Sequence, residues 1–145
     1  MATHTTTSDI HPCLTYVDAP TAIDWLCRVF GFTKRLIVHG PSDSIRHSEL
    51  SLGNGVVMVS SARAGRAGPG QVGGFRASMS VCVADPDAHF ARSAAAGATI
   101  TQPIRDEEYG ARGYAVLDLE GHEWYFGDYR PGRYWSDSGV AEHDG

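Results

Sequence analysis

Three residues of this sequence have side chains and positions that suit proton transfer. His47 and Glu49 are two positions apart in the first arm of an expected hairpin, so their side chains share one face of the strand. An imidazole beside a carboxylate can move a proton, and the same pair is equally well explained as a salt bridge on a solvated strand face. His11 could act as a general base, although a lone strand histidine is more often a hydrogen-bonded structural residue. These three residues are the catalytic candidates.

Arginine and aromatic side chains suggest contacts with an organic ligand. Arg112 follows Tyr109, Gly110 and Ala111, and its planar guanidinium can anchor an anionic substituent. The alternative is a loop arginine bonded to Asp118 or Glu120. Well-placed rings add on the order of 1 kcal/mol each to the binding of a planar ligand. Most of the rings are expected in the core or in subunit contacts, and the stacking candidates are Trp25, Tyr109, Tyr114, Trp124, Tyr129 and Trp135.

The elements that position these residues form two repeats. Each half begins with a strand that runs into an aspartate and a proline, at 13–20 and 79–86. The proline suits the first turn of a helix, and Asp18 or Asp85 can cap it. Each helix is expected to end at a left-handed glycine, Gly31 or Gly97.

A strand (33–38 or 99–104), a loop and a hairpin with its turn at 53–55 or 120–122 follow each helix. Hairpin positions recur 67 residues later, which indicates a duplication; they are Leu50, Leu52, Val57 and Val59, then Leu117, Leu119, Trp124 and Phe126. The pattern predicts an α+β fold of two tandem βαβββ modules.

The 145-residue length and 42% hydrophobic content fit one folded domain. We expect it to span 10–135, with module one at 10–60, a glycine-rich linker at 61–74 and module two at 75–130. Residues 1–9 and 136–145 have few large apolar side chains and are expected to be disordered tails.

Charge and hydrophobicity exclude several classes of partner. The net charge of −5 provides no basic surface for nucleic acid. No apolar run approaches the roughly 20 residues of a membrane span, and no signal peptide is evident, so a cytoplasmic protein is expected. The three cysteines form no CxxC pair, which suggests neither disulfides nor a zinc knuckle.

Five segments together resemble the vicinal oxygen chelate superfamily, which includes glyoxalase I, bleomycin-resistance proteins and extradiol dioxygenases. They are similar to its PhnB-like or glyoxalase-like group, and the resemblance spans 10–130. The segments are AIDWLCRVFGF, RHSELSLGNGVVMVS, VADPDAHFARSAAAGA, YGARGYAVLDLEGH and EWYFGDY. The resemblance implies a curved mixed sheet around a cleft, and a homodimer with modules either side by side or exchanged between chains.

In metal-using members of the superfamily, the ligands come from the first and last strands of each module. The resemblance places those positions at His11, Met58, Ser78 and Tyr125, with 67 residues between the paired positions. Only His11 is a good ligand for Zn or Ni, so we predict no metal site and no cofactor. His47 and Glu49 resemble the HxE of PhnB-like sequences, which leaves a displaced metal site as an alternative.

Strand alternation and the resemblance together predict the cleft lining. We expect a small, soft and weakly polar surface that suits an organic molecule. The ligand-binding candidates are His11, Cys13, Thr15, His47, Glu49, Met58, Ser60, Ser78, Ser80, Tyr109, Arg112 and Tyr125.

The leading hypothesis is a protein that sequesters an organic compound or natural product without chemistry, as antibiotic-resistance proteins of the bleomycin type do. The alternative is a glyoxalase-like, metal-dependent lyase or isomerase centred on His11, His47 and Glu49. A third possibility is a paralogue whose cleft is filled by its own side chains.

Overall fold

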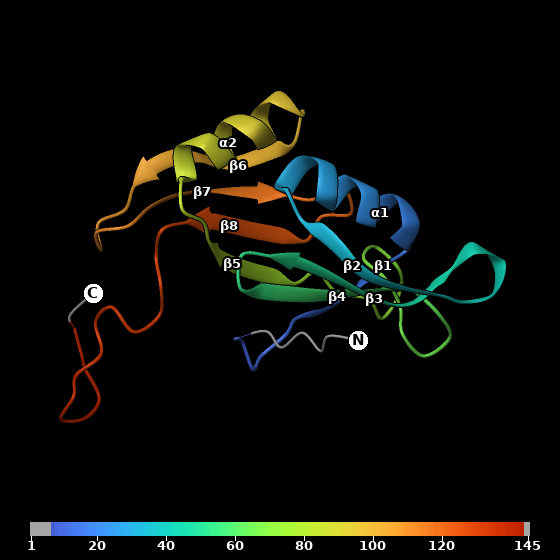
Figure 1. Cartoon of the computed structure of the whole chain (residues 1–145), viewed down its shortest axis with the longest axis horizontal. Coiled ribbons are helices and arrows are strands. Elements are labelled where there is room, and N and C mark those ends of the chain that lie inside the picture. The colour runs from blue at the N-terminus through green and yellow to red at the C-terminus, as the bar shows by residue number, and fades with distance from the viewer. Residues whose placement is uncertain (1–6, 144–145) are drawn as a thin grey trace, which may run out of the picture.

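The computed structural model describes residues 7–143, and two βαβββ modules follow each other along them (Figure 1). The predicted tails, 1–9 and 136–145, extend outside the described residues at 1–6 and 144–145. Module one consists of β1 (Cys13–Tyr16), α1 (Ala19–Trp25), a π-helical turn η1 (Leu26–Phe30), β2 (Thr33–His39), a 3-10 turn η2 (Pro41–Asp43), β3 (Ile45–Leu52) and β4 (Gly55–Ser61). Module two consists of β5 (Ser78–Cys82), α2 (Pro86–Ala95), β6 (Thr99–Asp106), β7 (Arg112–Leu117) and β8 (Glu123–Gly127).

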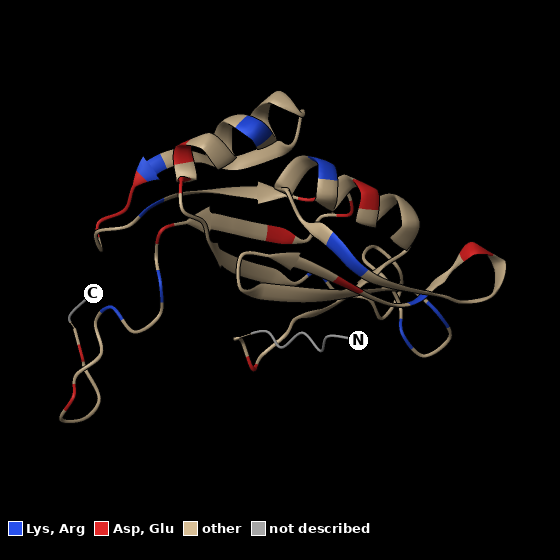
Figure 2. Cartoon of the chain, in the orientation of Figure 1, with Lys and Arg blue, Asp and Glu red and all other residues tan. Residues whose placement is uncertain are grey.

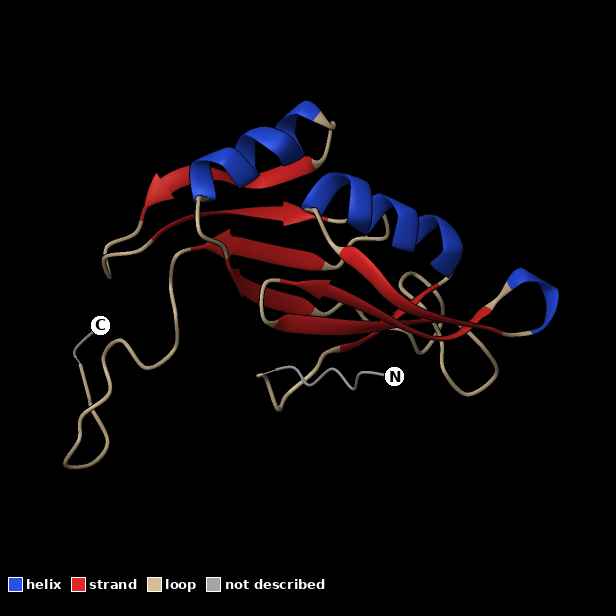
Figure 3. Ribbon diagram, in the orientation of Figure 1, coloured by secondary structure: helices blue, strands red, loops and turns tan. Residues whose placement is uncertain are grey.

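Each module forms a four-stranded mixed sheet. The strand order is β1-β4-β3-β2 in sheet one and β5-β8-β7-β6 in sheet two. The first and last strands of each module are parallel, and the other pairs are antiparallel. Both helices lie along one side of the strands (Figure 3). The predicted α+β fold of two tandem modules is therefore confirmed.

The predicted helix ends are confirmed as well. The Asp18 carboxylate accepts from the backbone N–H of Thr21 at 3.3 Å, and Asp85 caps α2 in the same way. Gly31 and Gly97 follow the helices with φ values of 85° and 83°, a conformation that favours glycine.

The second hairpin turn is longer than predicted. β7 ends at Leu117 and β8 begins at Glu123, so the turn spans 118–122 rather than 120–122. Asp118 explains the difference, because its carboxylate accepts from the backbone N–H groups of Glu120 and His122, both at 3.0 Å. These bonds satisfy backbone N–H groups of the loop, which in a tighter turn would have paired with the opposite strand.

Both modules share one hydrophobic core. The helix-covered faces of the two sheets and the apolar side of α1 and η1 belong to one cluster of buried side chains. Phe30 lies at the junction, with its ring centroid 5.5 Å from Trp124 and 4.8 Å from Phe126. Trp124 is fully buried, in agreement with its predicted position under a helix.

Asp118 joins the modules by buried hydrogen bonds. Its Oδ2 accepts from Tyr16 Oη at 2.6 Å and from Trp124 Nε1 at 3.0 Å. Burial, and then the adjacent Asp118 carboxylate, raise the pKa of Tyr16 well above its usual value. Tyr16 is therefore a neutral donor between the two halves of the chain.

The same turn holds the edge of β1. The Glu120 carboxylate accepts from the N–H groups of Val17 and Asp18 at 2.7 and 2.8 Å, at the start of α1. A carboxylate is favourable at a helix N-terminus. His122 donates from Nε2 to the Thr15 carbonyl at 3.1 Å, so the loop of module two is fixed against module one.

His89 provides a further contact between the modules. Its Nε2 lies 2.8 Å from the Phe30 carbonyl, which can only accept, and its Nδ1 lies 2.6 Å from Tyr114 Oη. In the neutral imidazole the proton is therefore on Nε2, and Nδ1 accepts from Tyr114 Oη. Burial lowers the pKa of His89, since it disfavours the charged imidazole.

Lowering the pH is expected to destabilise the fold through His89. Above the unfolded-state pKa of about 6.5, both states are neutral and His89 makes no pH-dependent contribution. As the pH falls from there towards the lower folded-state pKa, the unfolded chain takes up the proton first, so the free energy of unfolding decreases. Urea denaturation across this range should show a steeper loss for the native chain than for His89→Gln. Equal slopes would contradict the prediction.

Acidic and basic residues are interspersed over both helices, as Figure 2 shows, whereas β4 and β5 have none. Within the described part of the chain, no helix has the length and apolar character needed to cross a membrane.

Candidate ligand-binding site

Each sheet has one face that points away from the shared core, which we call its open face. On sheet one, Cys13, Met58 and Glu49 lie side by side in the register of β1, β4 and β3. Thr15 and Ser60 form the next row. The structure thus brings together six predicted residues on this face: Cys13, Thr15, His47, Glu49, Met58 and Ser60. His11 is half-buried and precedes β1.

His47 and Glu49 are in direct contact on this open face. His47 Nε2 lies 2.8 Å from Glu49 Oε2, and the two side chains are 38% and 39% exposed. The pair has the geometry of an acid–base couple, and also that of a half-exposed salt bridge, which contributes little stability.

The open face of sheet two contains Ser78, Ser80 and Tyr125. Ser80 and Tyr125 are cross-strand neighbours. Tyr125 Oη lies 3.5 Å from Glu107 Oε1. Burial, and then hydrogen bonding to Tyr109, raise the pKa of Tyr125, so its phenol is neutral.

Glu107 is held as an ionised acceptor beside Tyr125. It accepts from Gln102 Nε2 at 2.8 Å and from Arg105 Nε at 3.2 Å. The Arg105 contact is the main reason that the pKa of Glu107 is lowered. Sequence inspection did not identify this group, because Tyr125 reaches Glu107 only through the pairing of β7 with β6 and β8.

Arg112 pairs with two carboxylates. It makes a bidentate contact to Asp87, with Nη2–Oδ1 at 2.8 Å and Nε–Oδ2 at 3.0 Å, and its Nη1 lies 3.1 Å from Asp106. The alternative expectation of a bond to Asp118 or Glu120 is wrong. At the junction between the modules, Asp118 accepts from the Tyr16 hydroxyl and Glu120 accepts from the Val17 N–H. A ligand anion would compete with Asp87 and Asp106 for this guanidinium.

Tyr109 is exposed and contacts Tyr129 edge to face, with ring centroids 5.5 Å apart. Tyr114 and Trp124 are fully buried. These two of the predicted stacking candidates are therefore core residues.

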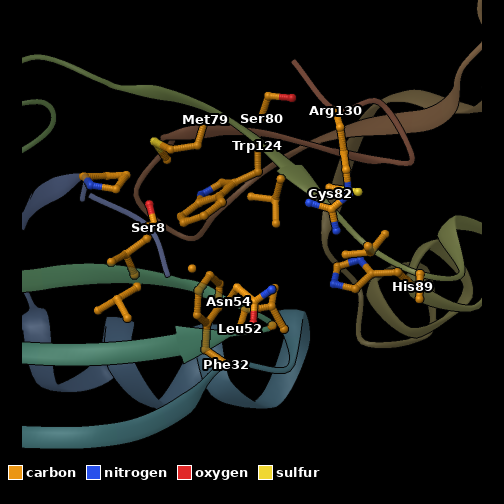
Figure 4. A pocket seen from close by; sticks show the side chains of 18 of the residues that line it. Ser8, Phe32, Leu52, Asn54, Met79, Ser80, Cys82, His89, Trp124 and Arg130 are labelled. Carbon is orange, nitrogen blue, oxygen red and sulfur yellow. The ribbon is translucent and has the colours of Figure 1, made fainter. Parts of the chain in front are cut away.

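A cleft of about 1090 Å³ lies between the β3–β4 turn, β5 and the start of α2, and we call it the inter-module cleft (Figure 4). Ser78 and Ser80 are the two predicted residues that border it. Both belong to β5, the strand that borders the cleft and also forms one edge of the open face of sheet two. Other lining residues of the cleft include Leu52, Asn54, Met79, His89 and Arg130, and the buried rings of Phe32 and Trp124 form part of its wall.

The residues that the resemblance places at the metal positions do not fit a divalent ion. Met58, Ser78 and Tyr125 provide a thioether, a hydroxyl and a neutral phenol, which leaves His11 as the single good donor. Among residues 7–143, no three His, Cys, Asp or Glu side chains gather in a group that could hold a metal ion.

Comparison with known proteins identifies the class. The model of the Glyoxalase/Bleomycin resistance protein/Dioxygenase superfamily matches residues 8–126, and the chain belongs to this superfamily. Among solved structures, TioX from Micromonospora sp. ML1 is 41% identical, with a TM-score of 0.74, and the match covers 85% of this chain and 99% of TioX. An uncharacterized protein of Mycobacterium tuberculosis is 31% identical over 123 residues, 81% of this chain and 72% of that protein. A lactoylglutathione lyase from Agrobacterium tumefaciens shares the fold, with a TM-score of 0.65 and 16% identity over 90% of this chain and 97% of the lyase.

Proposed function

We propose that this protein binds an uncharged small organic molecule, such as a natural product, and holds it without metal or chemistry. The observation that carries the proposal is the lining of the inter-module cleft and the adjoining open face of sheet two. It combines apolar, aromatic and small hydroxyl side chains with two arginines, Arg92 and Arg130, and one carboxylate, Asp85, a set that favours an organic guest over a cation. Binding of this kind in the cytoplasm would lower the free concentration of a toxic compound, which is the physical basis of resistance by sequestration.

We further propose that two chains form a homodimer through their open faces. Within one chain, the modules contact each other through the helix-covered faces and the edge of β1. The open faces are left exposed, with Leu36 and Val38 on sheet one 43% and 37% exposed. Pairing sheet one of one chain with sheet two of its partner would cover these side chains and enclose a ligand.

The contact between His47 and Glu49 favours a second candidate function, a lyase or isomerase that uses this pair as its acid–base centre. This second candidate differs from the binding function because it requires the protein to convert a substrate into a product. The glyoxalase-like form of this candidate also requires bound metal.

A thermal-shift screen of hydrophobic natural products, followed by calorimetry, tests the binding function. A ligand at 100 times its Kd is expected to stabilise the fold by roughly 2.7 kcal/mol, whereas added Zn or Ni should leave the Tm unchanged. The same preparation should sediment at twice the 15.6 kDa chain mass. The proposal fails if no compound stabilises the protein while metal raises its Tm sharply. Stoichiometric metal that is lost in Glu49→Ala would instead support the second candidate.

A further inference from the structure

The ring of Tyr125 lies along the surface of sheet two instead of standing on it. Gly113 and Gly127 are direct cross-strand partners, and both are beneath the ring. A Cβ added at Gly113 would lie 2.4 Å from Tyr125 Oη, and one at Gly127 would lie 2.9 Å from Cε1. Neither glycine has a left-handed φ. They therefore provide space for a close approach rather than an unusual backbone conformation.

The tip of the ring is held in place. Its hydroxyl is next to the Glu107 carboxylate, which is 11% exposed and accepts from Gln102 and Arg105. A carboxylate that accepts hydrogen bonds from two further side chains has little freedom to move. The plane of Tyr125 is thus fixed at both ends, by the strand and by Glu107.

The opposite face of the ring is accessible. The cross-strand neighbours of Tyr125 are Ser80 and Ala115, two small residues that cannot cover an aromatic ring. Ser80 also borders the inter-module cleft. The face of the ring that points away from the glycines is therefore directed outward over the open face of sheet two, the second part of the proposed ligand space.

From this arrangement we infer that Tyr125 is a specificity-determining shelf on which a planar aromatic part of the ligand stacks. Aromatic rings attract one another beyond the area they bury, and an offset stack requires one accessible π-face. A tyrosine that stood upright would present an edge, which suits aliphatic guests equally well. This inference rests on the proposed function and specifies the chemical class of its ligand.

Two probes with the same carbon skeleton, 2-naphthol and decahydro-2-naphthol, test the shelf, because only the first is planar. Calorimetry on the full chain should show a preference of about two- to tenfold for 2-naphthol. Its proton resonances should move upfield on binding, as they do above an aromatic ring. Tyr125→Leu should abolish both the preference and the shift, and Tyr125→Phe should retain both.

Phe75→Leu is the matched control, because Phe75 is an aromatic residue that is 74% exposed and belongs neither to the shelf nor to the lining of the cleft. It should leave the preference unchanged. Equal binding of the two probes to the native chain, or an unchanged preference in Tyr125→Leu, would overturn the shelf and leave ligand binding itself standing. If neither probe binds, the shelf is also overturned, and the natural-product screen decides the proposed function separately.

Discussion

Replacing Asp118 with alanine is expected to lower the free energy of unfolding by about 3–5 kcal/mol. The carboxylate is 5% exposed and accepts four hydrogen bonds, two from backbone groups of its own turn and two from Tyr16 and Trp124. Its removal leaves the buried Tyr16 hydroxyl and Trp124 indole N–H without a partner, and each such group costs roughly 1–3 kcal/mol. The turn also loses the two bonds that Asp118 accepts from the backbone N–H groups of Glu120 and His122.

Urea denaturation measures this effect, and Asp128→Ala is the matched control. Asp128 is exposed and also accepts one backbone hydrogen bond, from Arg112 at 2.8 Å. We expect the control to lose no more than about 1 kcal/mol, and Tyr16→Phe to fall between the two variants. A loss in Asp118→Ala as small as that of the control would show that the carboxylate does not join the modules.

The architecture was predictable because its signals are local or repeated. The caps at Asp18 and Asp85 depend on residues three positions away. The duplication appears as a constant offset in the sequence. These features require no knowledge of how the modules pack, and each was correct in the structure.

The contacts between modules were not predictable, because they join residues far apart in sequence. Tyr16 and Asp118 are 102 positions apart, and no local pattern distinguishes this aspartate from an exposed one. The partners of Arg112 were mistaken for the same reason, since Asp87 lies on α2 and not in the adjacent hairpin.

The shelf had a signal in the sequence that was overlooked. Glycine in the middle of a sheet often marks the close approach of another group, and Gly113 and Gly127 are on neighbouring strands. The sequence alone could not show that the approaching group is Tyr125. That depends on the ring direction, which is set by Glu107, the residue directly after β6.

Gly113→Ala is expected to destabilise the fold by about 1–3 kcal/mol, the usual cost of overpacking. The added methyl would lie 2.4 Å from Tyr125 Oη and 2.7 Å from the Phe126 carbonyl. The ring is held by Glu107 and the carbonyl belongs to the sheet, so neither group can move away without cost. Because alanine is compatible with the backbone conformation, the whole effect should come from these contacts.

A double-mutant cycle with Tyr125→Leu separates the two contacts. If the ring lies on Gly113, the alanine substitution should cost less in the Tyr125→Leu background, with a coupling of at least about 0.5 kcal/mol. The remaining loss belongs to the Phe126 carbonyl. Gly55→Ala is the matched control, since its Cβ would meet nothing closer than the Leu52 carbonyl at 3.5 Å, and it should be nearly neutral. Additive losses in the cycle would mean that Tyr125 does not rest on the glycine pair, and the stacking surface proposed for the ligand would lose its physical basis.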